Sequence, residues 1–269
     1  MGNPVRYTDP RGNICLDPWA PSGIHFDPNR DCEYPEGSTG AYWWRRDPIG
    51  ENTAIISMPW VDEMDAEFWK KYPNSCGAAA LYMFLMGEGK PVVFETLVQQ
   101  LQSERPGGYD PYCGVYSDNG SWGAIPSPTP DPNGWNNKAC VSADALASVA
   151  RKYYGLNIEA GDNWTYKKAN QKVKAGHPML TLIRVDLTTT DFGHFVVIRG
   201  FDDAGWTVIL NDSCPARRYG NRSASARRNA GERRREDWEK FDLSWASAVD
   251  AGNDPLAPGG HVRWGMAVK

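Results

Sequence analysis

The segment from Asn74 to Met86 reads Asn-Ser-Cys-Gly-Ala-Ala-Ala-Leu-Tyr-Met-Phe-Leu-Met, polar at its start and then apolar without interruption. Ala, Leu and Met favour helix, and no proline or β-branched residue breaks the run. Because apolar residues cover every side, the pattern predicts a helix buried in the middle of a domain. Gly87 and Gly89 are expected to end it, as glycines past a helix C-terminus do.

Cys76 should then occupy the first turn of this helix. Free N–H groups and the positive end of the helix dipole favour an anion there. A thiolate is an anion, so this position suits a nucleophilic cysteine. The alternative is that Cys76 is a small buried residue, as most free cysteines are. Catalysis would need a base and an orienting group elsewhere in the chain.

Candidates for both lie far downstream. Three apolar runs separated by turns predict three strands, over 179–185, 193–200 and 205–210. The turn-rich residues 201–205 predict that the last two form an antiparallel hairpin. His194 begins one strand and Asp212 follows the end of its partner, so the two should be neighbours. The carboxylate could bond one imidazole nitrogen and leave the other facing Cys76.

This order of nucleophile, histidine and aspartate resembles the papain-like cysteine peptidases, and more closely the peptidase C39-like family. The motifs that carry the resemblance are Asn74-Ser75-Cys76-Gly77-Ala78-Ala79-Ala80-Leu81, Gly176-His177-Pro178, Gly193-His194-Phe195-Val196-Val197-Ile198-Arg199-Gly200-Phe201-Asp202 and Ile209-Leu210-Asn211-Asp212. The resemblance spans residues 56–212. It implies Cys76 as nucleophile, His194 as base and Asp212 as orienting group.

Two positions depart from the family pattern. Ala78 stands where the family usually has proline, a mild change at a first helical turn. Glu63, in Pro59-Trp60-Val61-Asp62-Glu63, falls near the family's glutamine on the oxyanion side. An ionised carboxylate cannot donate a hydrogen bond to an oxyanion. Either Glu63 is protonated, or another donor serves, or activity is weakened.

Composition excludes several classes. The chain has 269 residues and a formal net charge of −4, so no global nucleic-acid signature is present. No apolar run approaches a membrane span, and the first residues lack a signal-peptide pattern. The six cysteines form no Cys-x-x-Cys pair, which argues against a structural zinc site. Cys15 with Cys32 and Cys113 with Cys140 could pair as disulfides, Cys214 being left over, or all five could be reduced thiols.

The remainder divides into an irregular N-terminal arm, 1–55, and one domain, 56–269. The arm repeats Asp-Pro and carries several tryptophans. Helices are predicted over 91–104, 142–154, 167–175 and 237–248, and an edge strand over 261–268. The aromatic, proline-rich loop 105–139 is a candidate wall of a substrate cleft. His177, alone before a proline, is expected to be structural.

Residues 215–235 form the most unusual segment. They contain eight arginines against one acidic residue, Glu232. The composition predicts a flexible basic insertion near the proposed site. It is either a solvated loop or an attachment site for an anionic polymer such as a bacterial wall or nucleic acid.

The sequence therefore predicts an α+β, papain-like peptidase with no metal or organic cofactor and no membrane insertion. The resemblance extends to actinobacteriophage lysin peptidases. It implies a protein made in the cytoplasm that reaches the wall after a holin opens the membrane, and there cuts peptidoglycan stems or cross-bridges. The alternatives are a peptidase acting on protein substrates, a related acyl transferase, and a non-catalytic binding module of the same fold.

Overall fold

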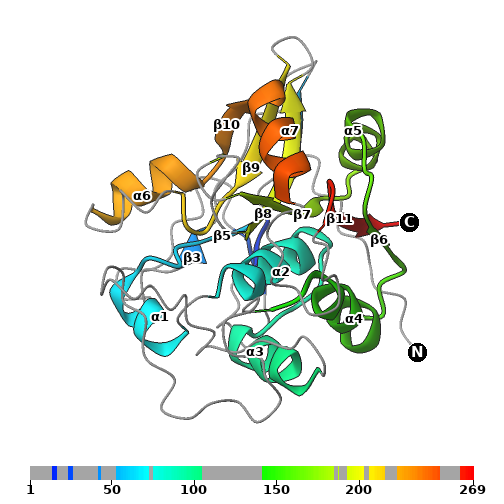
Figure 1. The fold of residues 1–269 in the computed structure, drawn as a ribbon. Coiled ribbons are helices and arrows are strands. Elements are labelled where there is room, and N and C mark those ends of the chain that lie inside the picture. The colour runs from blue at the N-terminus through cyan, green and yellow to red at the C-terminus, as the bar shows by residue number, and fades with distance from the viewer. Residues whose placement is uncertain are drawn as a thin grey trace, which may run out of the picture.

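A computed structural model describes residues 14–16, 24–26, 42–43, 53–72, 75–104, 141–184, 187, 193–202, 206–215, 223–248 and 261–269 (Figure 1). The proposed disulfide partners and the loop 105–139 lie outside the part whose side chains are described. So do most of the N-terminal arm and residues 216–222 of the basic segment. The division into arm and domain therefore stays a prediction.

Seven strands form the central sheet, and all their pairings are antiparallel. Along the sheet the order is β10 (Arg234–Asp237), β9 (Thr207–Asn211), β8 (Gly193–Asp202), β7 (Met179–Arg184), β11 (Gly265–Val268) and β6 (Ile158–Gly161). β4 (Thr53–Ile55) also pairs with β8. Two small pairs complete the strands: β1 (Ile14–Leu16) with β2 (Ile24–Phe26), and β3 (Tyr42–Trp43) with β5 (Trp60–Val61).

The three predicted strands and their hairpin are confirmed as β7, β8 and β9. The C-terminal strand was predicted at the sheet edge, and this is wrong. β11 lies between β7 and β6, and β6 is the strand beyond it. β6 was not predicted, because its four residues are mostly half-buried and show no clear alternation of apolar and polar side chains.

Helices cover both faces of the sheet (Figure 1). α2 (Cys76–Gly87), α3 (Phe94–Ser103) and α4 (Ala143–Tyr154) pack on one face, and α5 (Tyr166–Lys174) and α7 (Trp238–Ser247) on the other. The alternation of strand residues explains this arrangement: Phe195 and Val197 of β8 join the first core cluster, whereas Val196 and Ile198 join the second.

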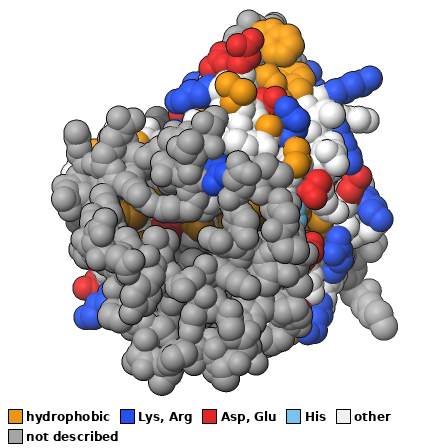
Figure 2. Space-filling view, viewed as in Figure 1, with side chains coloured by type: hydrophobic (Ala, Val, Ile, Leu, Met, Phe, Trp, Pro, Cys, Tyr) orange, Lys and Arg blue, Asp and Glu red, His pale blue; other side chains and the backbone are white. Residues whose placement is uncertain are grey.

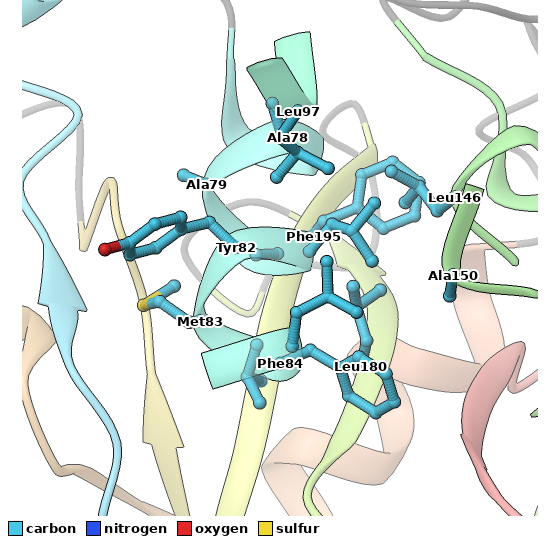
Figure 3. Close-up of a cluster of buried hydrophobic side chains, with 14 of the residues drawn as sticks. Ala78, Ala79, Tyr82, Met83, Phe84, Leu97, Leu146, Ala150, Leu180 and Phe195 are labelled. Carbon is cyan, nitrogen blue, oxygen red and sulfur yellow. The ribbon is translucent and has the colours of Figure 1, made fainter. Parts of the chain in front are cut away.

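α2 is confirmed as the buried central helix. All ten residues from Gly77 to Met86 are buried. In Figure 3 its side chains lie among those of Leu97, Leu146, Ala150, Leu180 and Phe195, which come from α3, α4 and the sheet. A helix apolar on every side needs apolar partners on every side, and this position between two helices and a sheet supplies them.

The other predicted helices are found within a few residues of their expected ends. Ser142 caps α4 through a 3.0 Å bond from the Ala145 N–H, and Gly155 ends it in the left-handed conformation at φ 64°. α1 (Ala66–Lys71) and α6 (Ala224–Gly231) were not predicted. None of the described helices is long and apolar enough to cross a membrane.

Candidate active site

Cys76 is the first residue of α2, with Ser75 as the N-cap. The thiol is free and partly exposed, although the residues that follow it are buried. Ala79 donates its N–H to the Ser75 carbonyl at 2.8 Å, so the first turn forms directly at the cysteine. The first N–H groups of a helix have no intrahelical acceptor and are available to a developing anion.

His194 is the second residue of β8, and its side chain is buried. Its Nε2 lies 2.7 Å from Oδ1 of Asp212. The Cys76 side chain interacts with the same imidazole and helps to raise its pKa. Because Nε2 is occupied by the carboxylate, Nδ1 is the nitrogen left for the thiol. The structure thus brings together the three residues that the sequence singled out.

Asp212 directly follows β9 and is held at every polar atom. Oδ1 accepts from His194 and from the N–H of Cys214 at 2.9 Å, and Oδ2 accepts from Arg234 at 2.8 Å. The backbone carbonyl accepts from the indole N–H of Trp60 at 2.7 Å, and the backbone N–H donates to Gly231 at 3.0 Å. A carboxylate fixed in this way can set the orientation of the imidazole.

The charges of this pair support each other. Burial alone would lower the pKa of His194, but the Asp212 carboxylate and the Cys76 side chain raise it well above its usual 6.5. Burial alone would raise the pKa of Asp212, but His194 and Arg234 lower it to about 2. The imidazolium–carboxylate pair is therefore favoured at neutral pH, and an imidazolium stabilises a neighbouring thiolate.

Glu63 lies next to this pair and is 2% exposed. Its backbone N–H donates to the Ser213 carbonyl at 3.0 Å, and the Ser213 hydroxyl donates to Oε2 at 3.0 Å. Burial raises the pKa of Glu63 to about 7, although His194 and Ser213 act in the opposite direction. Much of Glu63 is thus a neutral acid at neutral pH.

The comparison with protein families gives a match over most of the chain. The sequence profile of the Peptidase_C39 like family matches residues 55–251, which include all four site residues. The chain belongs to the Peptidase_C39 like family. A crystal structure of a C39-like peptidase candidate from Bacillus anthracis is 15% identical, with a TM-score of 0.43 over 73% of this chain and 89% of that one. The comparison with curated proteins gives no significant match.

Membership of the Peptidase_C39 like family fits the observed α+β, papain-like arrangement: a helix led by a cysteine, packed on an antiparallel sheet that carries histidine. Both residues that depart from the family pattern, Ala78 and Glu63, are buried. Ala78 is fully buried in α2, and Glu63 stands beside the histidine–aspartate pair. That Glu63 takes the place of the family's glutamine stays a prediction, and a carboxyl group there can donate a hydrogen bond only while it is protonated.

The basic segment differs from the flexible loop that was predicted. Residues 223–235 contain α6 and the start of β10. Arg227 forms a bidentate pair with buried Asp62, from Nε to Oδ2 at 2.9 Å and Nη2 to Oδ2 at 2.8 Å, and also contacts Oδ1. Counting charges within the segment failed here, because Asp62, Asp212 and Asp202, which pair with arginines of the segment, all lie outside it.

Sequence reasoning missed Arg234 and Ser213. Arg234 was hidden among eight arginines, and only its pairing with Asp212 separates it from the others. Ser213 follows Asp212 directly, and a serine at that position gave no signal of contact with Glu63. His177 bonds Glu88 through Nδ1 at 3.1 Å, away from the triad residues, as expected of a structural histidine.

Among the described residues, no group of three or more His, Cys, Asp and Glu side chains is placed to hold a metal ion.

Proposed function

We propose that this protein is a cysteine peptidase in which Cys76 is the nucleophile, His194 the general base and acid, and Asp212 the orienting group. The observation that carries the proposal is the 2.7 Å bond between Nε2 of buried His194 and Asp212, on an imidazole whose pKa the Cys76 side chain also helps to raise. A binding module has no physical need for a thiol, an imidazole and a carboxylate in this chain of contacts.

The reaction would proceed in two halves. The Cys76 thiolate attacks the carbonyl carbon of the peptide, and the tetrahedral intermediate collapses as imidazolium His194 gives its proton to the leaving amine. Neutral His194 then takes a proton from water, which attacks the thioester. The carboxylate product leaves, and the thiolate–imidazolium pair is restored.

The oxyanion of each intermediate needs donors. The Cys76 N–H, at the start of α2, supplies one. Glu63 supplies the second in its neutral form, since a carboxylic acid has an O–H to donate and a carboxylate has none. Burial beside Asp212 is what keeps that proton on Glu63 near neutral pH. This assignment rests on the resemblance to the glutamine of the family.

The substrate we propose is the peptide part of peptidoglycan, cut by a phage lysin. The support is the resemblance to lysin peptidases. The proposed attachment of residues 215–235 to an anionic wall polymer is less well supported, because Arg227, Arg228, Arg234 and Arg235 are each ion-paired within the molecule. Figure 2 shows acidic and basic side chains interspersed on the described surface at the right of the view.

Digestion of purified peptidoglycan by the wild type and by Cys76→Ala tests the function, with mass spectrometry of the released fragments. New amine and carboxyl termini are expected only with the wild type, and their masses would identify the bond. Alkylation by iodoacetamide, followed at the Cys76 peptide, separates the alternatives. An inert Cys76 with no cleavage would leave a binding module, whereas a reactive Cys76 with no wall cleavage would favour a protein substrate.

Attachment to the wall needs its own measurement. Cys76→Ala protein is mixed with intact walls and sedimented at low and at high salt. Salt-sensitive binding would support an electrostatic contact through the basic segment. Binding that is equal at low and at high salt, or no binding, would contradict an electrostatic contact.

A further inference from the structure

Asp212 has a second charged partner besides His194. Its Oδ1 faces the imidazole, and its Oδ2 accepts from Nη1 of Arg234 at 2.8 Å. The Arg234 side chain is 11% exposed and the Asp212 side chain 1%. The carboxylate therefore lies between two cations, one of which belongs to the proposed catalytic machinery and one to the basic segment.

The contact is built by the backbone as well as by the side chains. β10 pairs with β9 so that Arg234 lies opposite Leu210, two residues before Asp212. Just before β10, the Gly231 carbonyl accepts the Asp212 N–H. A Cβ on Gly231 would lie 2.3 Å from the Asp212 carbonyl oxygen, so only glycine permits this close approach. Residues 231–234 thus wrap around Asp212.

Arg234 is itself fixed by further contacts. Its Nε donates to Glu236 at 2.6 Å, and its Nη1 donates to the Pro215 carbonyl at 3.1 Å. The guanidinium is planar and does not lose its proton in proteins, so it presents a constant positive charge in one orientation. A buried ion pair of this kind contributes little net stability, because desolvation offsets the attraction. Because Arg234 bonds the same carboxylate that bonds His194, it can act on the site and not only on stability.

We propose that Arg234 is a positioning residue of the peptidase site, which keeps Asp212 ionised and turned toward His194 and so makes the reactivity of Cys76 depend on the basic segment. The inference rests on the proposed function of the three residues. It assigns to one arginine a role that the net charge of the segment does not suggest.

The charged groups around Asp212 determine the sign of the effect. His194 on β8 and Arg234 on β10 stabilise the carboxylate, whereas Glu63, after β5, opposes it once ionised. Cys76 on α2 acts through His194. Without Arg234, a buried carboxylate keeps only one cation, so it takes up a proton at higher pH. His194 then loses its anionic partner and gives up its own proton more readily. The Cys76 thiolate in turn loses the positive charge that stabilises it.

The test is the pH profile of Cys76 alkylation by iodoacetamide, measured at the Cys76 peptide by mass spectrometry, which needs no substrate. Arg234→Gln is expected to move the acidic midpoint of the profile upward by half a pH unit or more and to slow alkylation severalfold at pH 5. Arg234→Lys, which keeps the charge, should restore most of the profile. The matched control is Arg235→Gln on the same strand, whose partner Asp202 lies outside the site.

Several results would overturn the inference. An unchanged profile in folded Arg234→Gln would do so, as would a uniform slowing without a shift of the midpoint. If that variant does not fold, Glu236→Gln replaces it: removing the competing carboxylate should move the midpoint downward, and no movement or an upward one contradicts the role. A wild type whose Cys76 is no faster than glutathione at pH 6 would instead reject the proposed function, and the role of Arg234 with it.

Discussion

At the scale of single residues, protonation decides what the site can do. Glu63, His194 and Asp212 are all buried within one network. Burial disfavours the charged form of each of the three groups, but the neighbouring charges differ from one group to the next. Asp212 bonds His194 and Arg234 directly and stays ionised, whereas at Glu63 burial outweighs the attraction of His194, so that Glu63 holds its proton up to about pH 7. Two carboxyl groups a short distance apart are thereby given different roles.

Glu63→Gln should stabilise the protein above pH 7 and have little effect below pH 4.5. Glu63 has a folded pKa of about 7 and an ordinary value of 4.5, so folding holds its proton while the unfolded chain releases it. The free energy of unfolding of the wild type is therefore unaffected by the ionisation of Glu63 below pH 4.5. It falls by roughly 3 kcal/mol as the pH rises from 4.5 to 7, for a pKa shift of this size. Urea unfolding of both proteins between pH 4 and 8 measures the difference. A gap that does not change with pH would contradict the shifted pKa.

The same variant tests the proposed oxyanion donor. Wild-type activity that needs neutral Glu63 should decline as pH rises through 7, where the acid ionises. The glutamine amide donates at any pH, so Glu63→Gln should keep its activity to higher pH. The ratio of variant to wild-type kcat/KM is expected to rise between pH 6 and 9. A ratio that stays flat or falls would remove Glu63 from the reaction.

At the scale of elements, the position of the cysteine depends on how closely α2 meets its neighbours. Gly77 follows Cys76 directly, and a Cβ there would lie 2.2 Å from Cγ1 of Val141 and 3.2 Å from Cδ2 of Phe195. The helix start can approach the chain before α4 and strand β8 only because this residue has no side chain. Small residues along the rest of α2, such as Ala78 and Ala79, continue the close packing (Figure 3).

Gly77→Ala should therefore destabilise the protein by about 1–3 kcal/mol, although alanine is the better helix former. Chemical denaturation measures the loss. The control is a double-mutant cycle with Val141→Ala, which removes the clashing methyl groups. The two changes together should cost clearly less than the sum of the single changes. Simple additivity would show that the contact with Val141 is not the cause.

At the scale of the whole molecule, residues 223–235 are part of the fold. Arg227 of α6 reaches Asp62, next to Glu63, and Arg234 of β10 reaches Asp212. These two pairs anchor the segment to both sides of the site. Trp60 ties the same parts together through its bond to the Asp212 carbonyl. The site is thus assembled from segments that are well separated in the sequence.

Arg227→Gln should cost about 3–5 kcal/mol at neutral pH, because it leaves the fully buried Asp62 carboxylate without its cation. Asp62→Asn combined with Arg227→Gln removes both charges and should be less destabilised than Arg227→Gln alone. Thermal or urea unfolding gives the comparison, with Arg235→Gln as the exposed control expected within about 0.5 kcal/mol of the wild type. Equal losses in Arg227→Gln and Arg235→Gln would reject the anchoring role.

The sequence by itself determined the elements that carry strong local patterns. An uninterrupted apolar run fixed α2 and placed Cys76 at its start, and a hairpin between two apolar strands fixed the neighbourhood of His194 and Asp212. Local propensity and hairpin geometry suffice for these, since each depends on residues close together in the chain.

Only the tertiary structure decided the charges of the site and the role of the basic segment. The proton on Glu63 depends on burial, and the charge of Asp212 depends on His194 and on Arg234, which lies 22 residues further along the chain. The interior place of β11 likewise depends on β6, whose own pattern is weak. Desolvation and long-range pairing arise only when distant segments meet, so residue order alone does not determine them.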